Sequence, residues 1–253
     1  MVHIGNTVLG DGTVKICIPL AGKNREVLAE RMREVTKAAP DLIEWRMDSL
    51  EEKVQEADIS GIFSVIREKA GNIPVLCTMR TAAEGGNCRM SEGEYCDFYE
   101  RLCKEESPDA VDVEIISKQK AAAQIISAAH ERNIPVIGSC HDFSGTPRPE
   151  EILKVLETME KAGADIVKMA VMPHSAEDAD IVFEAAARYR MREAHRPYIV
   201  ISMGEFGKRT RVEAPGLGAA MCFATAGGIS SAPGQIPADE LRRIWKKDFG
   251  ARQ

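Results

Sequence analysis

Short apolar runs rich in β-branched residues alternate with longer segments of helical periodicity from about residue 15 onward. The longer segments, such as Arg25–Lys37 and Pro149–Ala162, are rich in Ala, Glu, Lys and Leu. This alternation predicts parallel strands joined by crossover helices, and eight strands within 253 residues favour an α/β fold that closes into a (β/α)8 TIM barrel. The predicted strands are Lys15–Leu20, Leu42–Asp48, Pro74–Arg80, Ala110–Ile115, Pro135–His141, Ile166–Val171, Tyr198–Met203 and Gly218–Ala224.

A turn signal precedes the first predicted strand. Gly10-Asp11-Gly12 lies between Thr7–Leu9 and Val14, which predicts a short hairpin at the N-terminal end of the barrel. No linker, low-complexity stretch or repeat of fixed period interrupts the rest, so we expect a single catalytic domain over 1–253. An open sheet that binds a dinucleotide would need a glycine-rich fingerprint after an early strand, and Leu20-Ala21-Gly22-Lys23 does not match one.

The charge balance and the cysteines exclude several functional classes. The formal net charge of −6 argues against nucleic-acid binding, because that needs a concentrated basic surface, but it leaves room for a small anionic substrate. No apolar run approaches membrane-spanning length, and the N-terminus lacks the layout of a signal peptide. The seven cysteines show no C-x-x-C pairing. We therefore expect a reduced, cytoplasmic protein without disulfides, metal site or membrane partner.

Charged residues gather in and after the predicted strands, toward the C-terminal ends where barrel enzymes carry their active sites. Alternation along the second strand turns Glu44 and Arg46 into the barrel, Arg80 ends the third strand, and Asp112 and Glu114 share one side of the fourth. Buried charges are costly unless they are paired or used. For any one of these residues a structural ion network is an equal alternative, whereas their convergence from several strands favours function.

Lys168 lies within the sixth predicted strand, where lysine is rare without a partner or a role. Burial beside cations such as Arg46 and Arg80 would favour the neutral amine, which attacks carbonyl groups and forms an imine. The imine is an electron sink for breaking a neighbouring C–H bond. The alternative is that Lys168 merely neutralises Glu44 or Glu114.

His141 ends the strand before Lys168, and a histidine there can transfer protons near neutral pH. Glu84 lies four residues beyond Arg80 in a glycine-rich loop. It can orient the imidazole of His141, or it is an ordinary loop carboxylate. The other four histidines lie at the N-terminus, near helix ends or in a loop, so we expect them to be solvated.

The loop Ser231-Ala232-Pro233-Gly234-Gln235 follows the eighth predicted strand and would lie over the catalytic face. Ser231 and Gln235 can donate hydrogen bonds to a substrate carboxylate there. Arg211, from the segment after the seventh strand, can pair with the same carboxylate through its guanidinium, and Arg209 is the alternative. By itself such a loop is more often only a turn.

Five segments together closely resemble type I 3-dehydroquinate dehydratase, in the same order and with similar spacing from about the first strand to the final helix. The segments are Glu44-Trp45-Arg46-Met47-Asp48, Met79-Arg80-Thr81-Ala82-Ala83-Glu84-Gly85-Gly86, His141-Asp142-Phe143, Lys168-Met169-Ala170-Val171-Met172-Pro173 and Ser231-Ala232-Pro233-Gly234-Gln235. The resemblance implies a barrel enzyme, usually a homodimer, that acts in the shikimate pathway without a metal or organic cofactor.

The resemblance also implies roles for individual residues. Lys168 matches the lysine that forms an imine with the C3 ketone of 3-dehydroquinate, and Glu84 matches the carboxylate beside the catalytic histidine. His141 matches that histidine, which removes the C2 proton and assists loss of the C1 hydroxyl in a syn elimination to 3-dehydroshikimate. The positions that bind and surround the substrate in the family fall on Glu44, Arg46, Arg80, Arg211, Ser231, Gln235, Met203 and Phe223.

Two other functions compete with this interpretation. A class I aldolase also forms an imine inside a barrel, but it usually handles phosphorylated sugars and needs an anion site after strands seven and eight. A catalytically silent barrel that serves as a binding module would tend to lose its costly buried charges.

Overall fold

In the computed structural model the structure describes residues 1–52, 57–193, 195–228 and 232–250. Its strands form a parallel eight-stranded sheet in the order β10-β3-β4-β5-β6-β7-β8-β9. The backbone N–H of Ala220, just before β10, donates to the carbonyl of Tyr198 on β9 at 2.9 Å and so joins the two ends of the sheet. The strands are β3 (Lys15–Leu20), β4 (Leu42–Arg46), β5 (Val75–Thr78), β6 (Ala110–Glu114), β7 (Val136–Asp142), β8 (Ile166–Val171), β9 (Tyr198–Ser202) and β10 (Met221–Phe223).

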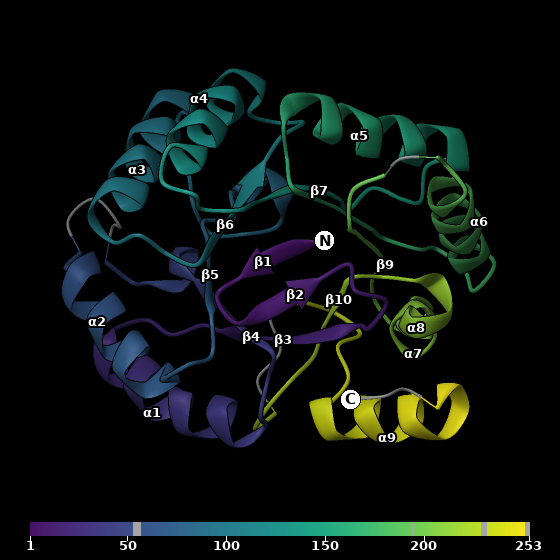
Figure 1. Ribbon diagram of the computed structural model, residues 1–253, viewed down its shortest axis with the longest axis horizontal. Coiled ribbons are helices and arrows are strands. Elements are labelled where there is room, and N and C mark those ends of the chain that lie inside the picture. Colours follow the sequence, from purple (N-terminus) through teal and green to yellow (C-terminus); the bar gives the residue numbers. More distant parts are fainter. Residues whose placement is uncertain (53–56, 194, 229–231, 251–253) are drawn as a thin grey trace.

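Helices surround this barrel as an outer ring (Figure 1). The outward-facing apolar residues of the strands pack against them in one continuous core. The predicted (β/α)8 barrel is therefore confirmed. The helices are α1 (Arg25–Lys37), α2 (Ile59–Ala70), α3 (Glu92–Glu105), α4 (Gln119–His130), α5 (Pro149–Ala162), α6 (Asp178–Arg190), α7 (Lys208–Val212), α8 (Ala214–Leu217) and α9 (Ala238–Phe249), with 3₁₀ turns η1 (Met47–Ser49) and η2 (Ala82–Glu84).

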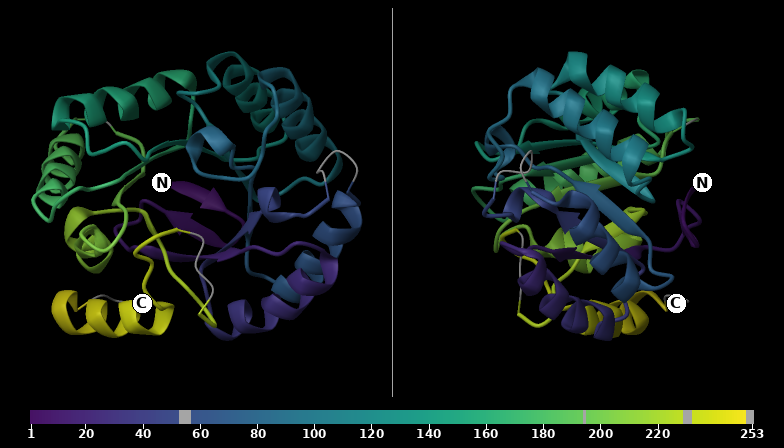
Figure 2. Two further views of the ribbon diagram at one scale, coloured as in Figure 1. Left: turned by 180° about the vertical axis from the view of Figure 1, so that it is seen from behind. Right: turned by 90° about the vertical axis from the view of Figure 1, so that its left-hand side faces the viewer.

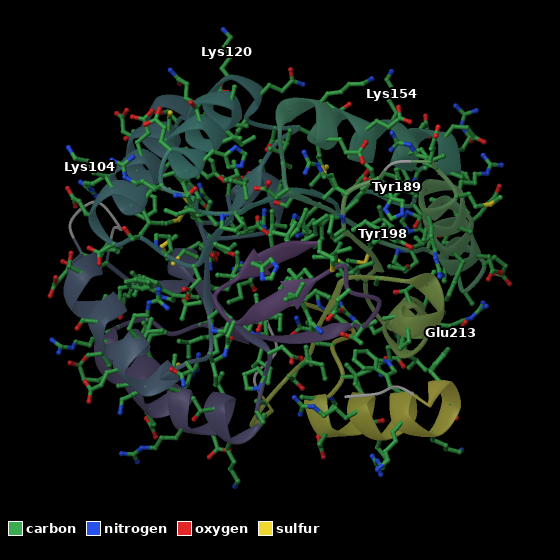
Figure 3. All side chains as sticks on the ribbon, viewed as in Figure 1. Lys104, Lys120, Lys154, Tyr189, Tyr198 and Glu213 are labelled. Atoms are coloured by element: carbon green, nitrogen blue, oxygen red, sulfur yellow. The ribbon has the colours of Figure 1, made fainter. Side chains whose placement is uncertain are left out.

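Local sequence signals define the helix ends. Ser91 and Glu94 form a capping box at the start of α3, and the Asn24 side chain accepts the N–H of Val27 in α1. Helix α5 begins at Pro149 and ends before Gly163, whose φ of 99° suits glycine. Charged side chains of the ring point outward, as Lys104, Lys120 and Lys154 do in Figure 3.

A short antiparallel hairpin closes the N-terminal end of the barrel, as the side view in Figure 2 shows. It pairs β1 (Val2–Ile4) with β2 (Thr7–Leu9) and turns at Gly5 and Asn6. The hairpin was predicted, but its turn was wrongly placed at Gly10-Asp11-Gly12. The pairing is set by Ile4 and Leu9, which are fully buried against the residues inside the barrel, so the two strands must precede the Gly10 bend.

Two of the predicted strands run two residues past the observed C-terminal ends. The chain leaves β4 after Arg46 and makes the 3₁₀ turn η1, so Asp48 does not continue the strand as expected. Strand β5 ends at Thr78, and Arg80 begins a turn in which Cys88 N–H donates to the Arg80 carbonyl at 3.2 Å. Within the described part of the chain, none of the helices combines the length and apolarity needed to span a bilayer.

Candidate active site

A cavity opens at the C-terminal ends of the strands. Ten of the predicted site residues line it: Glu44, Arg46, Arg80, Glu84, His141, Lys168, Met203, Arg211, Phe223 and Gln235. Gly85, Phe143, Ala170, Ile201 and Ala232 complete its wall. Ser231, the remaining predicted residue, lies outside the described residues. The other four histidines, at positions 3, 130, 174 and 195, are exposed as expected.

Lys168 projects from the middle of β8 and is 3% exposed. Its Nζ donates to Asp112 Oδ2 at 2.8 Å and lies 4.6 Å from the centre of the Phe223 ring. The alternative partners inferred from the sequence, Glu44 and Glu114, were therefore wrong. Asp112 and Lys168 come from alternate strands, β6 and β8, and inward residues of alternate strands share a layer in such barrels.

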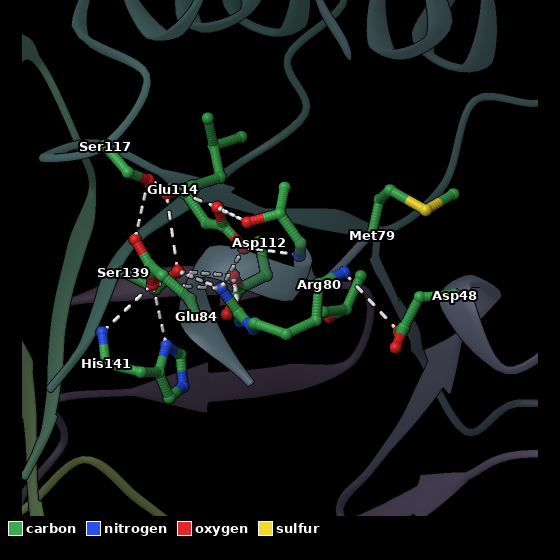
Figure 4. A network of polar contacts seen from close by, with 12 residues as sticks. Asp48, Met79, Arg80, Glu84, Asp112, Glu114, Ser117, Ser139 and His141 are labelled. Atoms are coloured by element: carbon green, nitrogen blue, oxygen red, sulfur yellow. Dashed lines mark hydrogen bonds and ion pairs between the residues drawn. The ribbon is translucent and has the colours of Figure 1, made fainter. Parts of the chain in front are cut away.

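Arg80 connects the buried charges of neighbouring strands (Figure 4). Its Nη2 donates to Asp112 Oδ1 at 2.5 Å, and its Nη1 donates to Ser139 Oγ at 2.9 Å and to Glu114 Oε1 at 3.3 Å. Burial alone would raise the pKa of Asp112, but Arg80 and Lys168 hold it well below its usual range. Asp112 therefore stays an anion between Arg80 and Lys168.

His141 ends β7 with its ring against Glu84, which lies on η2. Glu84 Oε2 lies 2.9 Å from both the backbone N and the Nδ1 of His141, so Nε2 is left for the cavity. Burial, with Arg80 and Lys168, lowers the pKa of His141 well below its ordinary value. Burial also raises the pKa of Glu84 to about 7, and Glu114 adds to this rise. The pair thus offers a neutral imidazole at neutral pH.

Backbone geometry brings Glu84 into this position. Gly86 lies so close to the Arg80 carbonyl that an added Cβ would stand 2.1 Å from its oxygen, so only glycine fits the turn. Thr81 donates to Glu114 through both its backbone N–H and its hydroxyl, each at 2.7 Å. These two hydrogen bonds attach the start of the turn to the end of β6.

Arg211, on α7, is buried without a carboxylate partner among the described residues. Its guanidinium donates to the carbonyls of Phe223 at 3.2 Å and Pro233 at 3.4 Å, and its Nε has no hydrogen-bond partner in the described structure. Burial lowers the pKa of Arg211, and the neighbouring Cys222 thiol offsets only part of the loss of water. Arg209 is half exposed and pairs with Asp180 and Glu213 on the outer surface, so of these two arginines Arg211 is the one that lines the cavity.

The two remaining charged residues in the wall have fixed positions. Glu44 Oε1 accepts the hydroxyl of Thr78 at 3.0 Å. Arg46 makes a two-pronged contact with Asp48, with Nε at 2.9 Å and Nη2 at 3.0 Å from the two carboxylate oxygens. Sequence reasoning put Asp48 on the strand and so missed that the η1 turn folds it back onto Arg46.

Three further polar residues support the site and were not among the predicted site residues: Asp112, Ser139 and Ser117. Asp112 was detectable from its inward parity on β6, but its pairing with Lys168 needed the barrel geometry. Ser139 Oγ donates to Asp112 Oδ1 at 2.6 Å, and Ser117 contacts Glu84. No group of three or more His, Cys, Asp or Glu among the described residues is placed to hold a metal ion.

Comparisons with known proteins agree with this geometry. The sequence profile of the type I 3-dehydroquinase family matches residues 16–251. The chain is 36% identical to the 3-dehydroquinate dehydratase of Bacillus velezensis over 243 residues, 96% of each chain, and 36% identical to that of Lactiplantibacillus plantarum over 241 residues, 95% of each.

Solved structures give the same result. The 3-dehydroquinate dehydratase of Geobacillus kaustophilus superposes with a TM-score of 0.93 at 33% identity, covering 100% of this chain and 97% of that one. The type I enzyme of Clostridium difficile, solved with covalently modified comenic acid, gives a TM-score of 0.91 at 32% identity and covers 99% and 98% of the two chains. The chain therefore belongs to the type I 3-dehydroquinase family of hydro-lyases.

Proposed function

We propose that this chain converts 3-dehydroquinate to 3-dehydroshikimate in the shikimate pathway, by syn elimination of water through an imine on Lys168. The observation that carries the proposal is that a buried lysine and a neutral histidine open onto one cavity. In the parallel pairing of β7 and β8, His141 stands beside Ala170, two residues beyond Lys168 and on the same inward-facing side. A ketone bound to Lys168 therefore presents its neighbouring carbon toward His141.

The first step is attack of Lys168 Nζ on the C3 ketone, with loss of water to give the imine. The protonated imine carries a positive charge at the position of Nζ. Asp112 lies 2.8 Å from that nitrogen and is held as an anion by Arg80, so it is placed to stabilise the cation. The face of the Phe223 ring lies against the same nitrogen and adds a cation–π contact.

The second step is proton removal from C2 by His141 Nε2. The C–H electrons move into the imine to form an enamine, and their return expels the C1 hydroxyl, which leaves as water with the proton that His141 returns. Glu84 accepts the Nδ1–H of the imidazolium that forms between these events. Hydrolysis of the imine then releases the product and restores Lys168.

Arg211 supplies the site for the substrate carboxylate. A buried guanidinium without a carboxylate partner in the described structure gains most from a bound anion. The family resemblance adds Gln235 and Ser231 to the same group. It assigns Glu44, Arg46 and Arg80 to the ring hydroxyls and ketone, and Met203 and Phe223 to the apolar wall.

The resemblance also supports a single catalytic domain over 1–253 that acts as a cytoplasmic homodimer without a metal or organic cofactor. Size-exclusion chromatography with light scattering tests the dimer, and a monomer at working concentration would refute it. If no metal takes part in the reaction, the protein should keep its activity after exhaustive chelation.

The activity is tested by mixing the purified protein with 3-dehydroquinate and following the ultraviolet absorbance of the conjugated enone product. We expect rapid formation of the enone with the native protein and none with Lys168→Met. Lys154→Met is the matched control, because Lys154 is an exposed lysine on α5 that points away from the barrel (Figure 3). Folded native protein that forms no enone would refute the proposed function, and an aldol cleavage product in its place would favour the aldolase alternative.

A further inference from the structure

Ser117 links the carboxyl group of Glu84 to solvent, on the side of that carboxyl group away from the substrate cavity. Ser117 follows β6 and is an exposed residue, whereas Glu84 and Glu114 are 4% and 0% exposed. Its Oγ lies 2.7 Å from Glu84 Oε1 and 3.2 Å from Glu114 Oε2, at the edge of the polar network drawn in Figure 4. Neither Ser117 nor Glu114 lines the substrate cavity.

The orientation of this hydroxyl does not follow from helix capping. A serine just before a helix commonly caps the first N–H groups. Here the side chain of Glu92, from α3, accepts the N–H groups of Lys120 and Ala121 at 3.0 and 3.2 Å and so caps α4 from outside. The hydroxyl of Ser117 is therefore directed at the two carboxyl groups and not at the helix N-terminus.

The two carboxyl groups differ in the donors that their oxygens have besides Ser117. Glu114 accepts hydrogen bonds from Thr81 N–H, Thr81 Oγ and Arg80, so both of its carboxylate oxygens have donors other than Ser117. Glu84 Oε2 faces the backbone N–H and the ring of His141, so Oε1 depends on Ser117. Glu84 is therefore the carboxyl group whose hydrogen bonding depends on Ser117, and burial raises its pKa to about 7.

A hydroxyl has one hydrogen and accepts another, so Ser117 can serve Glu84 in both forms. When Glu84 is ionised, Ser117 donates to Oε1. When Oε1 carries a proton, it donates to Ser117 Oγ, and the serine hydrogen turns toward Glu114 Oε2. We propose that Ser117 is a positioning residue that partners Glu84 in both protonation states and connects that carboxyl to solvent behind the substrate. This inference rests on the proposed role of Glu84 beside His141.

The consequence is a pH dependence set outside the substrate cavity. Removing the Ser117 hydroxyl takes a donor from ionised Glu84 and leaves burial and negative neighbours to favour the protonated form. The charged and titratable groups that face Glu84 are Arg80 after β5, Asp112 and Glu114 on β6, and Cys140 and His141 on β7. None of them changes in a Ser117 variant.

The test is the pH profile of kcat/KM for Ser117→Ala, with Ser117→Thr as the conservative variant and Ser127→Ala as the control. Ser127 is an exposed serine on α4 that contacts neither carboxyl group. Ser117→Ala should move the acidic limb up by about one pH unit, the size expected for loss of a hydrogen bond to a charged group. KM should stay unchanged, and kcat at high pH should remain within about twofold of the native value. Ser117→Thr and Ser127→Ala should keep the native profile.

A substrate-free measurement separates this inference from the proposed function. The infrared C=O band of protonated Glu84, identified by its loss in Glu84→Gln, should disappear at a higher pH in Ser117→Ala than in the native protein. Equal titration of this band in the two proteins, or an acidic limb that Ser117→Ala does not move, would overturn the proposal. A native protein that does not dehydrate 3-dehydroquinate would overturn the function, while the infrared titration would still decide the role of Ser117.

Discussion

On β8, Ile166 points into the N-terminal half of the barrel and Lys168, two residues later, points into the C-terminal half. The distance between them is about 7 Å along the strand. Ile166 belongs to an apolar cluster closed by Ile4 and Leu9 of the hairpin, whereas Lys168 lies in a network of charges. The same change occurs on β6 between Ala110 and Asp112 and on β7 between Ile137 and Ser139.

The difference shows how one barrel separates stability from chemistry. The N-terminal layer excludes water and gains free energy from apolar burial. The C-terminal layer contains charges that would be destabilising alone, and hydrogen bonds from Arg80 and Ser139 keep Asp112 ionised beside Lys168. The two layers use different residues of the same strands. Substitutions in the C-terminal layer should therefore lower activity while the fold persists, and substitutions in the N-terminal layer should lower stability while kcat persists.

The largest expected effect is loss of activity in Lys168→Met. Without the amine no imine forms, and we expect kcat to fall by about 10⁴-fold or more, as for other residues that act in covalent catalysis. The fold should persist, because methionine replaces the alkyl chain and Asp112 keeps its contact with Arg80. Steady-state kinetics and circular dichroism measure the two quantities. Substantial turnover by Lys168→Met would show that the reaction does not depend on the lysine of the C-terminal layer, and would contradict the proposed separation of stability from chemistry.

Ile166→Ala should give the reverse result. Truncating a fully buried isoleucine leaves a cavity and lowers the free energy of unfolding by about 2–5 kcal/mol. The kcat of the folded protein should stay near the native value, because Ile166 lies below the reacting groups and does not line the cavity. Denaturant unfolding combined with kinetics at low temperature tests this. A kcat loss as large as that of Lys168→Met would show that the layers are not independent.

Arg211→Met should lower kcat/KM by about 30-fold or more, since removing one member of a buried charge pair costs about 2 kcal/mol or more in binding. In the absence of substrate the same variant should be as stable as the native protein or more so, by about 1 kcal/mol, because it removes a buried cation without a carboxylate partner among the described residues. Arg209→Met, on the outer surface, is the control and should keep native kcat/KM. An equal loss in both variants would contradict the assignment of the carboxylate site.

The last prediction, with the smallest expected effect, concerns the acidic limb of the pH profile of kcat/KM in the native protein. The pKa of Glu84 is raised to about 7, so the carboxyl gains a proton as the pH falls through that value. Protonated Glu84 cannot stabilise the imidazolium of His141, and kcat/KM should therefore fall about tenfold per pH unit below pH 7. In Glu84→Gln the limb should move to lower pH, because the pKa of His141 itself is depressed, and kcat should be reduced. A limb that stays at pH 7 in Glu84→Gln would assign it to another group.

The sequence predicted the architecture well because strand parity and helix periodicity are local properties. Glu44 and Arg46 were placed inside the barrel from alternation alone, and the structure confirms that both line one cavity. Strand ends were predicted less well. Asp48 and Arg80 follow the strands in turns whose contacts come from other segments, such as the Asn87 N–H donated to Asp48 at 3.1 Å.

Contacts between distant strands could not be predicted. The pairing of Asp112 with Lys168 depends on the stagger of the barrel, which no local pattern specifies. The choice between Arg209 and Arg211 depends on how the short helix α7 lies against β9, and it needed the structure. The link from Ser117 to Glu84 joins positions 33 residues apart and left no signal in the sequence.

The central claim is that Lys168 forms a covalent imine with the substrate, and reductive trapping tests it most directly. The native protein, treated with 3-dehydroquinate and sodium borohydride, should lose activity and gain the mass of one reduced substrate imine per chain. Peptide mapping should place that mass on Lys168, and Lys168→Met should gain none. An active native protein that shows no adduct, or an adduct on another lysine such as Lys154, would contradict the account.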